Sequence, residues 1–464
     1  MSTEIPNNVG LEHDPQLARA LGVWHPRFLR WWDEVGPVGF DSSRVYLRTA
    51  ISASAEGWAN YAYVRMPEYR WGIFLAPRQP RKIGFGDHAE LEPWQQVPGE
   101  FRKELRRIIV TQGDTEPASV EQQRHLGQTA PSLYDLRNLF QINVEEARHL
   151  WAMVYLLHGF FGRDGREEAD ELLTRRSGHQ DHPRLLNAFN APIRDWLDLF
   201  CFAMFADRDG KYQLESLAES GFDPLSRTTR FMLTEEAFHM FVGESGIQRV
   251  VRRSADLMRE AGRDDIHALG GIELSLLQKY INQWYSESLD LFGGEDSSNA
   301  ATYFATGLKG RYRESGGGYA DHRALEDDYL VRKPDGEEIR IAARRAMNAV
   351  LRDAYVQDCE RGLKRWNREL ERRELAARLY LPAISFNRKV GLYAKLTCDP
   401  GGELVPADEF TARLNQWLPS EHDRGYVAEL IKPVYQPGKI AGWIAPPARG
   451  INSQSLDFEY VRIQ

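Results

Sequence analysis

The chain of 464 residues is poor in cysteine, with only Cys201, Cys359 and Cys398. These three are scattered and form no C-x-x-C pair. The chain is therefore not expected to bind an iron–sulfur cluster, and it is expected to work in a reducing compartment. An excess of basic residues is also missing, because 59 Lys and Arg stand against 67 Asp and Glu, for a net charge of −8. A chain without that excess neutralises few phosphates, which argues against a nucleic-acid partner.

Two other signals are absent. No apolar run approaches the length of a transmembrane helix, and the polar start M-S-T-E-I-P-N-N is unlike a signal peptide. We therefore expect no membrane partner. No G-x-G-x-x-G opens a helix after a strand, so a nicotinamide or flavin site in this chain is not expected either.

What the chain does contain is one short motif in two copies, E-E-A-R-H at 145–149 and E-E-A-F-H at 235–239. Only in these two places does a Glu precede a His by three positions. Positions i and i+3 share a helix face, so each motif can direct a carboxylate and an imidazole at one point. Both motifs lie in strongly apolar segments, which predicts buried helices whose polar groups a metal would compensate. The alternative is two amphipathic helices with solvated Glu and capping His.

A di-iron carboxylate site in a four-helix bundle also needs one carboxylate from each of two further helices. An antiparallel helix should therefore precede each motif, and the apolar residues predict one at about 101–126 and one at about 191–218. Gly113 and Pro117 interrupt the first of these, so it either bends there or ends near Gly113.

Glu116 and Asp207 are the acids at the matching depth on these two helices. Glu116 precedes Glu146 by 30 residues and Asp207 precedes Glu236 by 29, so the two halves read as a weak internal repeat of one helical hairpin. The competing acids are Glu104 and Glu121 in the first half and Asp209 and Glu215 in the second. The predicted metal ligands are Glu116, Glu146, His149, Asp207, Glu236 and His239.

The acids one position before the ligands, Glu145 and Glu235, turn about 100° away on a helix. We expect both to tolerate replacement by Gln far better than Glu146 and Glu236.

The predicted fold is mainly α, a ferritin-like four-helix bundle with extra helices and with N- and C-terminal extensions. The bundle core is expected at 101–292, between an N-terminal extension at 1–100 and additional helices with a loop at 293–380. A C-terminal extension with short strands follows at 381–464. Strand-like runs lie at Tyr69–Ala76 in the first extension and at Val390–Leu396 in the last.

The tandem motifs, the opening hairpin, the N-terminal W-H-P-R-F-L-R-W-W segment and the length closely resemble one family, the oxygenase components of benzoyl-CoA 2,3-epoxidases. The resemblance extends over nearly the whole chain. It implies a ferritin-like centre of two iron ions on the six ligands above, with the Asp position typical of this family. It also implies a separate NADPH-dependent reductase that carries FAD and iron–sulfur clusters, and a cytoplasmic role in aerobic benzoate degradation.

The function predicted on this basis is a di-iron monooxygenase that epoxidises the ring of benzoyl-CoA with O₂. The apolar residues near the predicted site suit an aromatic ring, and Gln112 could hydrogen-bond a carbonyl or a bound oxygen. The residues expected on the substrate side are Ile109, Gln112, Phe200, Ala203 and Met204, with Gln112 the candidate for a catalytic role. The alternatives are a hydrocarbon monooxygenase, a radical-generating subunit or a ferroxidase.

A coenzyme A thioester also needs basic residues for its phosphates. The candidates are the Arg-rich segment Arg344–Arg365 and the loop Lys309–Arg313, although the charge pattern of both favours a solvated surface over a binding site.

Overall fold

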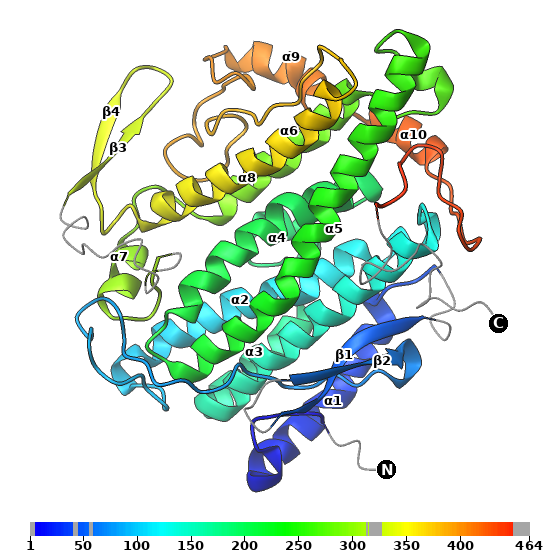
Figure 1. Cartoon of the computed structure of the whole chain (residues 1–464). Coiled ribbons are helices and arrows are strands. Elements are labelled where there is room, and N and C mark those ends of the chain that lie inside the picture. Colours follow the sequence, from blue (N-terminus) through cyan, green and yellow to red (C-terminus); the bar gives the residue numbers. More distant parts are fainter. Residues whose placement is uncertain (1–4, 40–44, 55–58, 312–313, 315–326, 449–464) are drawn as a thin grey trace.

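The computed structural model describes residues 5–39, 45–54, 59–311, 314 and 327–448. Helices dominate these residues, and the strands form two small hairpins at the periphery, as Figure 1 shows. The chain is thus mainly α with long packed helices, as predicted. No helix among the described residues is long and apolar enough to cross a membrane.

Four long helices form the ferritin-like bundle as two antiparallel hairpins that lie side by side (Figure 1). Their bounds are α2 Arg102–Gln123, α3 Leu133–Thr174, α4 Trp196–Ala218 and α5 Asp223–Ala261. Side-chain caps fix the starts of two of them: Ser132 accepts the backbone N–H of Asp135 for α3, and Asp195 accepts those of Leu197 and Asp198 for α4. The connection between the hairpins runs over residues 175–195, because α3 continues past a non-helical residue at Gly162.

Helix α2 continues through Pro117, so it does not end near Gly113. Gly113 serves close packing instead: a Cβ there would lie 3.1 Å from Cβ of Met153 on α3. With α2 packed closely on α3, Glu116 lies at the same depth in the bundle as Glu146, as the hairpin spacing predicted.

Helices α4 and α5 also pack closely, because two glycines of α5 face α4. A side chain at Gly243 would meet the backbone of Met204, and one at Gly246 would meet the ring of Phe200. This contact uses the apolar face of α4 as core rather than as the wall of a cavity.

The N-terminal extension covers the α3 side of the bundle with helix α1 Pro15–Val35 and an antiparallel hairpin, β1 Tyr46–Ala53 and β2 Ala59–Arg65. The predicted strand at Tyr69–Ala76 is wrong. This segment is extended and largely buried, but its one bridge joins Ile73 to Asn7. Burial against the bundle produces the apolar pattern there without any strand partner.

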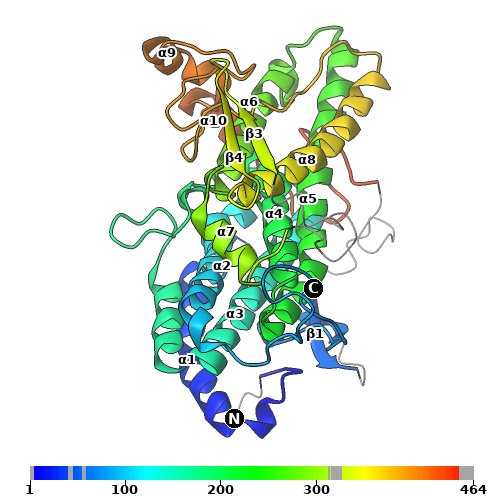
Figure 2. The same ribbon diagram turned by 90° about the vertical axis from the view of Figure 1, so that its left-hand side faces the viewer.

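The remaining elements pack on the α4 and α5 side. They are α6 Leu274–Leu291, α7 Ser298–Ala305, the hairpin of β3 Asp328–Arg332 and β4 Glu338–Ala342, α8 Met347–Glu371, α9 Ala407–Trp417 and α10 Glu421–Leu430. In Figure 2, α7 lies in front of α2 and α4, and residues of these three helices line one cavity. The strand expected at Val390–Leu396 is also absent, since that segment forms turns and the nearby pairing is a single bridge between Cys398 and Leu404.

Candidate metal centre

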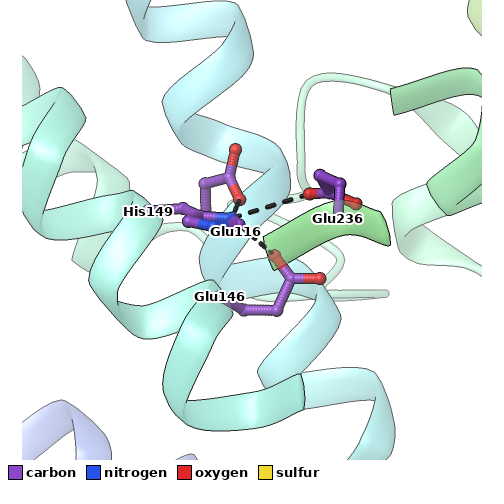
Figure 3. A group of neighbouring side chains, drawn as sticks. All are labelled: Glu116, Glu146, His149 and Glu236. Carbon is purple, nitrogen blue, oxygen red and sulfur yellow. Dashed lines mark ion pairs between the residues drawn. The ribbon is translucent and has the colours of Figure 1, made fainter. Parts of the chain in front are cut away.

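Six buried side chains from the four bundle helices converge at mid-bundle. Glu116 comes from α2, Glu146 and His149 from α3, Asp207 from α4, and Glu236 and His239 from α5. They form two overlapping groups whose ligand atoms lie within 4.8 Å of one another: Glu116, Glu146, His149 and Glu236 in one, and Glu146, Asp207 and His239 in the other. Figure 3 shows the first group gathered around the His149 ring. The tertiary structure therefore brings together all six residues predicted as ligands.

Glu146 and Glu236 each present one oxygen to each histidine. Glu146 places Oε2 3.7 Å from Nδ1 of His149 and Oε1 3.5 Å from Nδ1 of His239. Glu236 places Oε1 3.6 Å from Nδ1 of His149 and Oε2 3.5 Å from Nδ1 of His239. Glu116 Oε2 lies 3.3 Å from Nδ1 of His149, and Asp207 stands beside His239. Two carboxylates between two imidazoles, with one further carboxylate at each end, is the donor set of a two-metal site.

Four of the polar atoms that face the centre have no hydrogen-bond partner within the described residues. They are Nδ1 of His149, Nδ1 of His239, Oδ2 of Asp207 and Oε2 of Glu236. Unpaired buried polar atoms are costly, and several at one point indicate a missing cation. Four carboxylates match the charge of two divalent ions, and mixed oxygen and imidazole donors suit iron better than a thiolate-preferring metal.

The electrostatics agree with this fit. Burial raises the pKa of Glu146 well above its usual value, and burial together with the Glu236 carboxylate raises the pKa of Asp207 to about 8. Burial alone would lower the pKa of His149, but the carboxylates of Glu116, Glu146 and Glu235 beside its ring raise it well above the usual value. Raised pKa values favour the protonated forms of these groups, so the binding of cations here would release protons.

The outer nitrogen of each histidine is held by an acid from the facing helix. Nε2 of His149 lies 3.1 Å from Oε2 of Glu235, and Nε2 of His239 lies 3.1 Å from Oε2 of Glu145. Both acids are buried, with exposures of 3% and 5%. Carboxylates in this position fix the histidine tautomer and strengthen the ligand. The expectation that Glu145 and Glu235 turn away from the site is therefore corrected: each turns away from its own helix's ligands and toward the histidine of the other.

The two outer acids have different partners. Arg148 is buried and forms an ion pair with Glu235, with Nη2 2.5 Å from Oε1 and Nε 3.2 Å from Oε2. The residue that corresponds to Arg148 in the second motif is Phe238, so Glu145 is held by the neutral Gln141 amide instead. The site is thus symmetric in its ligands and asymmetric in the charge behind them.

A cavity of about 320 Å³ opens beside the cluster between α2 and α4. Gln112 lines it and donates a hydrogen bond from Nε2 to Oε1 of Glu116 at 2.9 Å. This side chain therefore lies between the cavity and the cluster. The other four residues expected on the substrate side do not line this cavity. Phe200, Ala203 and Met204 pack against the glycines of α5, and Ile109 is fully buried in the core.

Of the competing acids named above, Glu121 and Asp209 serve other purposes. Glu121 accepts hydrogen bonds from Arg184, Trp31 and the backbone of Ser177. Asp209 lies in the cavity wall, where it accepts a hydrogen bond from Gln213 at 3.0 Å.

Comparison with known proteins identifies the family of this chain. Residues 81–263 match the family described as phenylacetic acid catabolic protein, a range that contains all four bundle helices and all six converging residues. A curated relative, benzoyl-CoA oxygenase component B of Aromatoleum evansii, is 56% identical over 468 residues, with 99% of each chain covered. The chain belongs to the benzoyl-CoA oxygenase component B family.

Membership in the benzoyl-CoA oxygenase component B family confirms the resemblance that the tandem motifs carry. Sequence reasoning missed Arg148 and Gln213 as neighbours of the site, and it placed Glu145 and Glu235 on the wrong side. The doubled acid in both copies of E-E-A-x-H was the available signal for the last two.

Proposed function

We propose that this protein is the oxygenase component of a benzoyl-CoA 2,3-epoxidase. It would use O₂ and electrons from a separate NADPH-dependent reductase that carries FAD and iron–sulfur clusters. One observation carries the proposal: a buried six-residue cluster with unpaired ligand atoms adjoins a cavity, in a chain 56% identical over 99% of its length to a benzoyl-CoA oxygenase component. The cytoplasmic location that we propose agrees with three cysteines that are all free.

The residues proposed to hold two iron ions are Glu116, Glu146, His149, Asp207, Glu236 and His239. When bound, the iron pair supplies the reductive activation of O₂ that no amino-acid side chain can perform. The chain supplies the geometry: Glu145 and Glu235 orient the imidazoles, and Gln112 orients Glu116. Burial of the whole cluster excludes bulk water from the reaction.

The benzoyl group is proposed to occupy the cavity between α2 and α4. Its wall combines apolar residues such as Ile108, Leu217 and Phe292 with a few polar groups, which is the usual make-up of a site for a small aromatic acyl group. Gln112 faces this space and is proposed to contact the substrate. Ile109, Phe200, Ala203 and Met204 would shape the site only from the core behind it.

Lys309 is the cation proposed to face the acyl thioester. Its Nζ donates to Oε1 of Gln213 at 2.5 Å, and burial lowers the pKa of Lys309 to about 8. Arg107 lines the same cavity and is exposed, so it is available to the phosphates of the coenzyme A handle. Binding of that remote handle would position the ring beside the cluster.

The Arg-rich segment Arg344–Arg365 is less suited to this role. Arg352 forms a buried ion pair with Glu295, and Arg361 pairs with Asp358 at 2.8 Å. Arg313, from the loop that was also a candidate, lies outside the described residues.

The experiment is oxygen uptake by the iron-loaded protein with its reductase and NADPH, comparing benzoyl-CoA with benzoate at equal concentration. We expect uptake coupled to an oxygenated thioester with benzoyl-CoA, and only background uptake with benzoate. Equal uptake with both would favour a hydrocarbon-type monooxygenase. Uptake that follows added ferrous iron and needs no substrate would favour a ferroxidase, and a stable tyrosyl radical signal would favour a radical-generating subunit.

A further inference from the structure

A second cavity, of about 870 Å³, lies on the other side of the metal cluster. Its wall comes mainly from α3 and α5, whereas α2 and α4 supply much of the wall of the cavity assigned above to the substrate. Residues from β1, α8 and the segment at Pro447 complete it. We call this second space the arginine cleft.

The floor of the arginine cleft is the pair of acids that hold the histidines. Glu145 and Glu235 both line it, and Oε2 of Glu145 lies 3.1 Å from Nε2 of His239. Phe238, which stands where Arg148 stands in the other motif, lines the cleft as well. A molecule seated in the cleft is therefore separated from a proposed metal ligand by one side chain.

The cleft takes its name from five arginines: Arg48, Arg137, Arg249, Arg252 and Arg372. They outnumber the three glutamates that line the same space, Glu145, Glu235 and Glu369, on a chain whose net charge is −8. Arg249 is neutralised by Asp135, and Arg372 contacts Glu369. Arg48 is exposed over the ring of Tyr61, and Arg252 is half-buried and makes no ion pair with any described residue.

An apolar anchor lies among these charges. Phe241 lines the cleft and is 54% exposed, although it follows the buried end of the second motif on α5. Aromatic side chains and arginines are enriched at protein–protein interfaces.

We propose that the arginine cleft is the docking site for the electron-donating reductase, which would present a carboxylate-bearing segment to it. The inference rests on the proposed function, since it assigns the partner of the same metal centre. Charge complementarity selects an acidic protein surface. The short path through Glu145 to His239 selects an electron donor, because electron transfer slows steeply with distance. Substrate and reductase would then use opposite sides of the bundle and could be bound together.

The test is direct binding of the iron-loaded protein to the NADPH-dependent flavin and iron–sulfur reductase isolated from the same cells, measured by calorimetry without turnover. The variant carries Arg48→Glu and Arg252→Glu, and a second variant carries Phe241→Ser. The control is Arg340→Glu on β4, which is 70% exposed on a hairpin remote from the bundle (Figure 1). Iron content and helical circular dichroism establish that each variant is folded.

The expected result is a dissociation constant for the reductase raised on the order of tenfold or more by the double charge reversal, a smaller rise with Phe241→Ser and no change in the control. Added salt should weaken binding by the wild type more than binding by the double variant. When dithionite replaces the reductase as electron donor, any loss of turnover in the double variant should become smaller.

Three results would overturn the inference. The first is unchanged reductase affinity in the double variant. The second is weaker benzoyl-CoA binding with unchanged reductase affinity, which would make the cleft a site for the coenzyme A handle. The third is a change in oligomeric mass, which would assign the cleft to a second copy of this chain. Because binding is read without turnover, a wild type that binds the reductase through the cleft but consumes no oxygen with benzoyl-CoA would refute the proposed function alone.

Discussion

Replacing Glu235 by Gln should lower the free energy of unfolding more than the same change at Glu145. Glu235 is the sole carboxylate that ion-pairs with Arg148 among the described residues, and Arg148 is buried. Removing one partner of a buried ion pair leaves an uncompensated charge and costs about 3–5 kcal/mol. Glu145 is held by neutral Gln141 and by His239, so its replacement loses one strong hydrogen bond, at about 1–2 kcal/mol.

Urea unfolding of the metal-free variants measures this difference. Both variants should also bind iron more weakly than the wild type, by about 10–100-fold, because each loses the acid that orients a histidine ligand. A matched control combines Arg148→Met with Glu235→Gln. It should recover most of the stability lost in Glu235→Gln, since the unpaired charge is gone, while iron binding stays weak.

Equal losses of stability in the two single variants would refute the asymmetry between Arg148 and Phe238. Wild-type iron affinity in both would show that the hydrogen bonds to the histidines have no role in holding the metal.

Three further predictions follow from other parts of the molecule. Glu146→Ala and Glu236→Ala should each abolish turnover and lower the iron content, because each glutamate faces both histidines; metal analysis of the purified variants checks this, and a full iron complement in either would remove it from the ligand set. Burial lowers the pKa of His158 from 6.5 to about 4, so the native state resists a proton that the unfolded chain accepts. The free energy of unfolding of the wild type should therefore fall by up to about 3 kcal/mol relative to that of His158→Leu as pH falls from 6.5 to 4. Unfolding curves at several pH values measure this difference. The same pH dependence in both proteins would contradict it. Gly243→Ala should destabilise by about 3 kcal/mol or more, because its Cβ would meet backbone of α4, whereas Gly159→Ala on α3 has ordinary contact distances and should be neutral or slightly stabilising; equal melting temperatures for the two variants would argue against the close α4–α5 contact.

Local patterns were enough to predict the six residues that converge at mid-bundle. A Glu and a His three residues apart must share a helix face, so Glu146 with His149 and Glu236 with His239 follow from helix geometry alone. The near-equal hairpin spacings then led to Glu116 and Asp207, because rise per residue is constant along a helix. The mainly helical fold and the family followed from the same motifs.

Contacts between helices were beyond that reasoning. Glu145 and Glu235 point away from the ligands of their own helices, and only the crossing of α3 and α5 shows that each meets the other's histidine. The apolar face of α4 could equally have lined a cavity, and the glycines of α5 made it core. Buried segments such as Tyr69–Ala76 mimic strands because packing on a bundle and pairing in a sheet leave similar apolar patterns. The sequence by itself determined which residues share a helix face; the tertiary structure decided which faces meet, because that depends on how closely neighbouring backbones can approach.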